Sequence, residues 1–128
     1  MATLSEPLKI AIERPWSRQT SFNPDRWSKS NPAYGQCAVT ALVVQDFLGG
    51  RLKRTVAPGE ETVSHYYNEL PDGKIMDLTL RQFQKDTKFI EPEYREREYV
   101  LSYPPTAAKY QILKQRVLKE LSKLQDKK

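Results

Sequence analysis

An apolar helix with glycines at both ends constrains this 128-residue chain more than any other feature. Its apolar residues recur at helical spacing, at Val39, Leu42, Val43 and Phe47. Gly35, which follows Asn31-Pro32, prevents an earlier start, and Gly49-Gly50 ends the segment. We therefore predict a buried helix over residues 36–48, around which the rest of the fold is organised.

The only cysteine of the chain, Cys37, lies in the first turn of this predicted helix. Free backbone N–H groups and the positive end of the helix dipole favour a thiolate there. The alternative is that Cys37 is a small buried apolar residue. A single cysteine cannot form a disulfide within the chain, and this cysteine usage is typical of a reducing, cytoplasmic compartment.

A β-hairpin is the clearest local signal in the sequence. We predict strands at Thr62–Leu70 and Lys74–Leu78, joined by a loop over residues 71–73. Pro71 suits the first central position of a type I turn, and Gly73 suits the left-handed residue that follows it. A three-residue loop of this type fixes how the two strands pair.

This pairing brings the only histidine of the chain toward an acid. With a three-residue loop, Leu70 lies opposite Lys74, and Tyr67 lies opposite Asp77. His65, Tyr67 and Asp77 then share one face of the hairpin, with His65 and Asp77 on a diagonal. A two-residue loop would place Asp77 on the opposite face.

Together with the cysteine, the hairpin supplies the parts of an activated nucleophile. In that interpretation Cys37 attacks, His65 accepts and returns the proton, and Asp77 orients the imidazole. The backbone N–H of Cys37 and the amide of Gln36 are candidates for an oxyanion hole. The alternatives are a hydrogen-bonded strand histidine and an aspartate that caps a strand end.

The segment over residues 15–35 is rich in loops but holds several large aromatic side chains. One interpretation is a wrap whose tryptophans pack on the body of the domain. The other is that aromatic residues line a substrate cleft. The candidates for that cleft are Trp16, Trp27, Tyr34 and, from the hairpin, Tyr67.

The remaining elements complete an α+β fold in one domain over residues 1–128. We expect a short helix before Pro15, a strand at 51–56, a short helix from Thr79 to about Gln84 and a strand at 98–102. A last helix, capped by Thr106, carries one apolar stripe and a frayed end over residues 120–128. The stripe consists of Tyr110, Leu113, Val117, Leu121 and Leu124.

Charge and composition limit the partners. The whole net charge of +5 lies in residues 109–128, which we interpret as a solvated helix face rather than a nucleic-acid surface. No apolar run is long enough to span a membrane, and the N-terminus does not resemble a secretory signal. One cysteine and one histidine are too few for a zinc site, and no phosphate-binding loop is present. We expect no metal and no cofactor.

Three of these motifs together resemble the core of the transglutaminase-like, or papain-like, superfamily. They are Gly35-Gln36-Cys37 at the start of a helix, the His65-Tyr66-Tyr67-Asn68 strand, and Asp77-Leu78-Thr79. More narrowly, residues 35–46, 65–73 and 77–83 are similar to the bacterial YunG-type proteins. The similarity extends to Trp16 and Thr20 on one side and to residues 110–113 on the other, so it covers most of the chain.

The resemblance implies a helix bearing Cys37 packed against a small antiparallel sheet. It implies the roles of nucleophile for Cys37, base for His65 and orienting acid for Asp77. It does not supply a substrate, because the superfamily includes acyltransferases, peptidases, deamidases and inactive relatives.

We therefore predict a cytoplasmic cysteine hydrolase or acyltransferase that acts on the amide or thioester-type carbonyl of a small molecule, peptide or protein. The alternative is a non-catalytic binding or regulatory module that retains the fold. A third hypothesis is nucleic-acid binding through residues 109–128.

Overall fold

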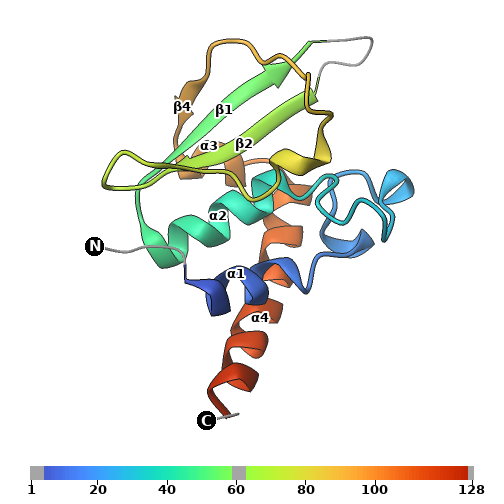
Figure 1. The fold of residues 1–128 in the computed structure, drawn as a ribbon, viewed down its shortest axis with the longest axis vertical. Helices are drawn as coiled ribbons and strands as arrows, with labels where there is room; N and C mark the ends of the chain where they lie inside the picture. The colour runs from blue at the N-terminus through green and yellow to red at the C-terminus, as the bar shows by residue number, and fades with distance from the viewer. Residues whose placement is uncertain (1–4, 59–62, 127–128) are drawn as a thin grey trace.

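The protein folds into an α+β domain in which a small antiparallel sheet lies against a group of helices (Figure 1). The computed structural model describes residues 5–58 and 63–126. The helices are α1 (Glu6–Glu13), α2 (Cys37–Leu48), α3 (Arg97–Leu101) and α4 (Pro104–Asp126). The strands are β1 (Arg51–Ala57), β2 (Val63–Glu69), β3 (Ile75–Met76) and β4 (Glu93–Arg95), and short 3₁₀ turns are η1 (Arg18–Thr20), η2 (Pro24–Arg26) and η3 (Leu80–Gln82).

Helix α2 is the centre of the hydrophobic core, as the sequence predicts. It lies between the sheet and the helices α1 and α4 (Figure 1). Leu42, Val43 and Val44 are at most 1% exposed, because the helix is covered on both sides. The helix begins at Cys37, with Gln36 as its N-cap residue, so the predicted segment is confirmed to within one residue.

The sheet has the strand order β3-β2-β1-β4, and the predicted hairpin register is confirmed. Asn68 pairs with Met76 and Glu69 pairs with Ile75. The Leu70 N–H donates to the Lys74 carbonyl at 2.8 Å, which closes the three-residue loop. Gly73 has φ +88°, the left-handed conformation that this turn requires. Strand β3 is shorter than predicted and ends before Asp77.

The predicted strand at 98–102 is wrong, because Arg97–Leu101 forms helix α3. The fourth strand lies just before it, at Glu93–Arg95, and pairs with β1. Only Val100 of α3 is buried, and one buried position in five residues fits a helix as well as a strand. The helix directs Arg97 to the α2 carbonyl of Leu42 and to the Gln45 side chain.

Helix α4 docks on α1 and α2 through the predicted stripe. Tyr110, Leu113 and Val117 are buried, while Leu121 and Leu124 are partly buried against the core. The helix continues to Asp126, and residues 127–128 lie outside the described part of the chain. Within that part, no helix combines the length and the apolar character that a membrane span needs.

Candidate active site

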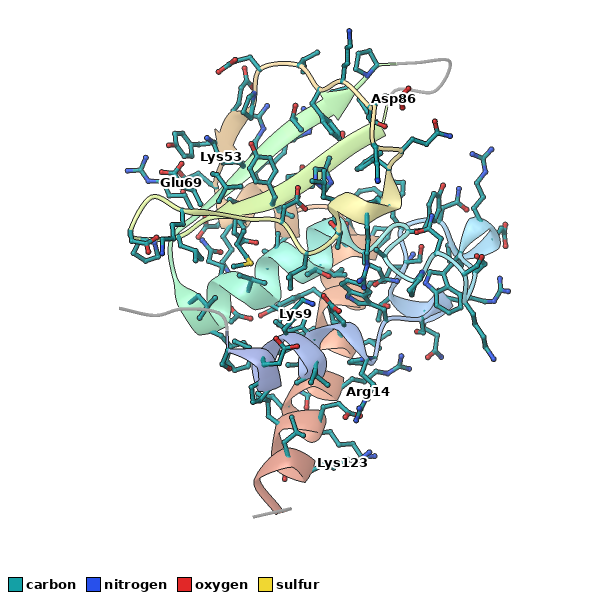
Figure 2. All side chains as sticks on the ribbon, viewed as in Figure 1. Lys9, Arg14, Lys53, Glu69, Asp86 and Lys123 are labelled. Carbon is teal, nitrogen blue, oxygen red and sulfur yellow. The ribbon has the colours of Figure 1, made fainter. Side chains whose placement is uncertain are left out.

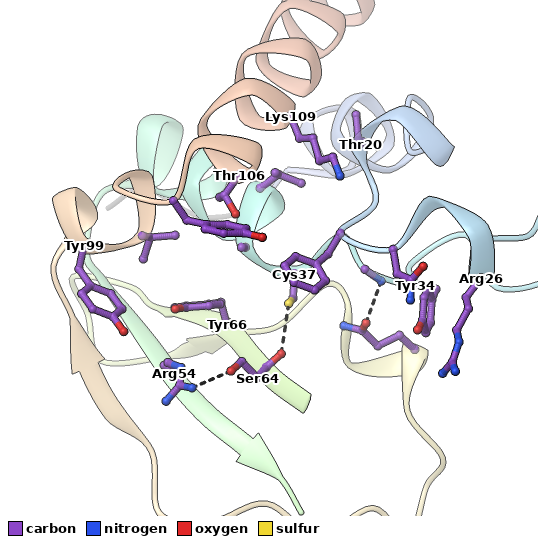
Figure 3. A pocket seen from close by; sticks show the side chains of 18 of the residues that line it. Thr20, Arg26, Tyr34, Cys37, Arg54, Ser64, Tyr66, Tyr99, Thr106 and Lys109 are labelled. Carbon is purple, nitrogen blue, oxygen red and sulfur yellow. Dashed lines mark hydrogen bonds between the residues drawn. The ribbon is translucent and has the colours of Figure 1, made fainter. Parts of the chain in front are cut away.

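Cys37 is the first residue of α2, and its side chain opens on a pocket at the helix N-terminus (Figure 3). The side chain is 9% exposed. Its Sγ donates a long hydrogen bond of 3.8 Å to the Ser64 carbonyl oxygen on β2. As the first helical residue, Cys37 has a backbone N–H with no acceptor inside the helix.

His65 lies on β2 and binds Asp77, as the hairpin register requires. Imidazole Nε2 is 2.6 Å from Asp77 Oδ2. Asp77 follows the last residue of β3 directly, so the length of the 71–73 loop sets this contact. His65 is 1% exposed and the Asp77 side chain is 14% exposed, so water competes little for the bond.

The second ring nitrogen of His65, Nδ1, is buried and makes no hydrogen bond to the described residues. Burial lowers the pKa of His65, but the hydrogen bond to Asp77 and the nearby Cys37 side chain outweigh it, raising the pKa from 6.5 to about 9. Near neutral pH the ring carries a proton that Asp77 and a Cys37 thiolate would both stabilise.

Aromatic side chains enclose the imidazole. Phe83 meets it edge-on with ring centroids 5.0 Å apart, Phe89 lies at 5.6 Å, and Tyr67 stacks at 5.8 Å. Phe83 and Phe89 also pack edge-to-face on each other at 5.1 Å. These rings exclude water from His65 and hold the plane of the imidazole, so the charged contacts around it act in a low dielectric.

The pocket beside Cys37 has a volume of about 710 Å³, which suits a small molecule or the end of a peptide. Its walls come from the start of α2, from β1 and β2, from the 20–35 loop, and from the region where α3 leads into α4. Figure 3 shows Arg54 and Ser64 on the sheet side of Cys37 and Lys109 on α4 across from them.

The structure places the other predicted site residues in different surroundings. Tyr34 lines the pocket. Trp16 is 5% exposed and donates to Thr40 Oγ1 on α2 at 3.0 Å, which is the wrap interpretation of this segment. The Gln36 side chain is fully buried and its Nε2 donates to the Ser17 carbonyl. Tyr67 lies against His65 rather than on the pocket wall.

Trp27, the remaining cleft candidate, lies in the loop next to η2. Its indole nitrogen donates to the Pro32 carbonyl at 3.0 Å, and it is not part of the pocket lining. The two tryptophans therefore stabilise the 15–35 segment. Neither of them lines the space in front of Cys37.

Gln82 is a site residue that the sequence alone did not single out. It lines the pocket, and its Oε1 accepts the Gly35 N–H at 3.0 Å. Its Nε2 is buried and has no partner among the described residues. The bond to Gly35 orients the carboxamide, so an unpaired N–H donor of a pocket-lining residue is fixed in direction. The only signal in the sequence was its place five residues after Asp77.

No group of three histidine, cysteine, aspartate or glutamate side chains in residues 5–58 and 63–126 is arranged to hold a metal ion. The side chains of the site offer a thiol, a charged imidazole, a carboxylate and amide donors.

Comparison with known proteins gives the family. The model of the YunG protein family matches residues 5–122. The chain is 34% identical over 96 residues to "Uncharacterized protein YunG" of Bacillus subtilis (strain 168), a match that covers 74% of this chain and 77% of the relative. No solved structure matches the chain. The chain belongs to the YunG family.

Proposed function

We propose that the protein is a cysteine-dependent hydrolase or acyltransferase, related in its core to the transglutaminase-like enzymes, that uses Cys37, His65 and Asp77. One observation carries the proposal. The buried imidazole of His65 is bound by the Asp77 carboxylate at 2.6 Å through Nε2. Its other nitrogen, Nδ1, has no hydrogen-bond partner among the described residues, and the Cys37 side chain lies nearby. A purely structural histidine has no need of that free nitrogen.

The reaction begins when the Cys37 thiol gives its proton to His65 Nδ1 and the resulting thiolate attacks the carbonyl carbon of an amide or thioester. The carbon–sulfur bond forms as the carbonyl electron pair moves to oxygen. The bond to the leaving group then breaks, and His65 Nδ1 gives its proton to that group. Water or an amine attacks the resulting thioester, its proton passes to Nδ1, and the thiolate leaves. Asp77 keeps Nδ1 directed at the reacting atoms throughout.

The developing oxyanion needs donors that are fixed before the reaction. The backbone N–H of Cys37 is one, because the first helical residue has no intrahelical acceptor. The free Nε2–H of Gln82 is the second, since Gly35 already orients its amide. Gln36 is a poorer donor than the sequence suggests, because its Nε2 is bonded to Ser17.

A non-catalytic binding module is the second candidate, and the direction of the thiol favours it. The Cys37 Sγ–H is directed at the Ser64 carbonyl at 3.8 Å rather than at Nδ1. Catalysis requires the sulfur to come within hydrogen-bond reach of Nδ1, a contact that often tightens only when substrate binds. A binding module would keep the thiol at Ser64.

Alkylation of native Cys37 by iodoacetamide distinguishes the two. A free thiol is only a few per cent ionised at pH 7, so pairing with imidazolium raises its alkylation rate by about tenfold. We expect Cys37 to react faster than glutathione at pH 7, and His65→Gln and Asp77→Asn to reduce that advantage. Thermal unfolding of each variant checks that it is folded.

The control variant is Cys37→Ser, which should take up no label because it removes the only thiol. Alkylation no faster than that of glutathione, and unchanged in a folded His65→Gln variant, would contradict the enzyme proposal. That result would favour the binding module.

A further inference from the structure

The pocket beside Cys37 has an unbalanced charge. Its described lining residues include Arg26, Arg54 and Lys109 and no aspartate or glutamate. Arg26 is exposed and is not without a partner, whereas Arg54 and Lys109 are partly buried. Even a fully ionised Cys37 supplies one negative charge against these two positive ones. Partly buried charges are normally paired, so the lining of this pocket lacks the negative group that would balance its positive charges.

Lys109 is the clearest unpaired cation. It is half-buried on α4, and within residues 5–58 and 63–126 it makes no hydrogen bond or ion pair. Its neighbours along α4 are different: Lys114 binds Asp46 at 2.8 Å, and Arg116 binds Ser17 at 2.9 Å. Unlike Lys114 and Arg116, the lysine that faces the pocket therefore has no hydrogen-bond or ion-pair partner among the described residues.

Arg54 on β1 adds a second positive charge on the opposite side of Cys37 (Figure 3). Its Nη2 donates to Ser64 Oγ at 2.7 Å, which holds the guanidinium but does not neutralise it. Glu93 is its cross-strand partner, yet that carboxylate binds Arg95 at 2.7 Å. Burial raises the pKa of the pocket residue Tyr66, and the Arg54 charge acts against that rise, so Arg54 is felt inside the pocket.

The mouth of the pocket is aromatic. Phe22, Tyr99 and Tyr103 are each more than half exposed, and the rings of Phe22 and Tyr103 lie 6.2 Å apart. Exposed rings around a positively charged interior suit a ligand with an apolar body and a negative group.

We infer that this pocket binds a small anionic compound, and that the acyl substrate therefore carries a carboxylate or phosphate group attracted by Arg54 and Lys109. The binding part of the inference is independent of catalysis. Only the assignment of the anionic compound as the acyl substrate rests on the proposed function. The two parts are tested separately.

Binding is tested with two fluorescent probes that share an apolar body. The probes are 8-anilino-1-naphthalenesulfonate, which is anionic, and N-phenyl-1-naphthylamine, which lacks the sulfonate. We expect tighter binding of the anionic probe to folded Cys37→Ser protein. Lys109→Gln and Arg54→Gln should each lower the affinity ratio of the two probes by about threefold, the effect of one unit charge several ångströms away in water.

The Lys109 variants and a control on the same helix separate a loss of charge from a change in folding. Lys109 makes no hydrogen bond or ion pair with a described residue that the substitution could break, and Lys109→Arg should restore the ratio. Lys119→Gln removes an exposed charge from the same helix outside the pocket and should leave the ratio unchanged. If neither Lys109→Gln nor Arg54→Gln changes the affinity ratio of the two probes in Cys37→Ser protein, the inference is overturned.

The substrate part is tested with iodoacetate and iodoacetamide, which differ by one negative charge. In both reactions the sulfur bonds to the CH₂ carbon and iodide leaves. We expect the ratio of the iodoacetate rate to the iodoacetamide rate to be higher for Cys37 than for glutathione. Lys109→Gln should lower this ratio by about threefold. A ratio equal to that of glutathione contradicts the substrate part. A Cys37 that reacts with neither reagent contradicts the proposed function, and the probe experiment then decides binding alone.

Discussion

His65 is a buried residue that carries a positive charge at neutral pH. Its pKa is raised from 6.5 to about 9, since the Asp77 and Cys37 contacts exceed the cost of burial. A raised pKa means that the folded state binds the proton more tightly than the unfolded state. The resulting stabilisation is complete below pH 6.5 and is lost as the pH rises through about 9.

We therefore expect the protein to unfold at lower urea concentration at pH 9.5 than at pH 6.5. The change in the free energy of unfolding is at most about 3 kcal/mol. Because His65 is the only histidine, its titration can be followed directly by NMR. Asp77→Asn should lower the midpoint of that titration and reduce the pH dependence. A midpoint at the ordinary value of 6.5 in wild type would contradict the argument.

The role of Gln82 can be distinguished from the roles of the other site residues by comparing two kinds of reaction. Acyl transfer forms an oxyanion and alkylation does not. We expect Gln82→Ala to slow the hydrolysis of p-nitrophenyl acetate by about 100-fold and to change iodoacetamide alkylation of Cys37 by less than about twofold. Equal loss in both assays would show that Gln82 only supports Gly35. Gln82→Glu keeps the acceptor for Gly35 but lacks the donor, so hydrolysis should be slow in that variant too.

At the scale of elements, two glycines with similar backbone conformations differ in surroundings. Gly35, before α2, has φ +73°, and a Cβ there would lie 2.2 Å from Ser21 Oγ and 2.8 Å from the Phe22 backbone nitrogen. Gly73, in the hairpin loop, has φ +88° and nothing within 4 Å of a Cβ. The first position is restricted by packing as well as by conformation, and the second by conformation alone.

Gly73→Ala should therefore destabilise the protein by about 1 kcal/mol, and Gly35→Ala by clearly more, because the backbone of the 20–35 loop must also move. Urea unfolding measures both changes. Gly35→Ala should also alter the alkylation rate of Cys37, since the helix start is displaced. Equal destabilisation by the two substitutions would show that the backbone of the 20–35 loop moves with no change in the free energy of unfolding.

The register of the hairpin could be predicted to the residue because its turn chemistry is local. Pro71 and Gly73 fix the loop, and the loop fixes which residues share a face with Asp77. The helix of Cys37 was predictable for the same reason. Helix α3 was not, because five residues with one buried side chain carry no periodicity. Gln82 was missed because its orientation depends on Gly35, which lies 47 positions earlier in the chain.

At the scale of the whole molecule, Asp46 connects three helices. From α2 its carboxylate binds Arg97 of α3 at 2.8 Å and Lys114 of α4 at 2.8 Å, and it accepts a hydrogen bond from Tyr110 of α4. Among the described basic residues of α4, Lys114 is the one that pairs with an acid of another helix, while Arg116 binds the neutral side chain of Ser17. Lys123 lies near the far end of α4 (Figure 2) and pairs with Glu120 of the same helix.

Asp46→Ala should destabilise the protein by about 2 kcal/mol, because Arg97 and Tyr110 lose a shared, partly buried partner. Glu93→Ala is the matched control, since it removes an ion pair of 2.7 Å whose glutamate is 68% exposed, and should cost less than about 1 kcal/mol. Urea unfolding measures both. Equal effects would indicate that the Asp46 contacts do not hold the helices together.

The seven residues from Asp77 to Phe83 make three separate contacts with the site. The Asp77 carboxylate binds the His65 imidazole, the Gln82 amide binds Gly35 before Cys37, and the Phe83 ring packs against His65. Adding or deleting one residue there would shift at least one attachment off its target. Among relatives that keep the cysteine and the histidine, we expect insertions and deletions to avoid this interval, even where its side chains have diverged.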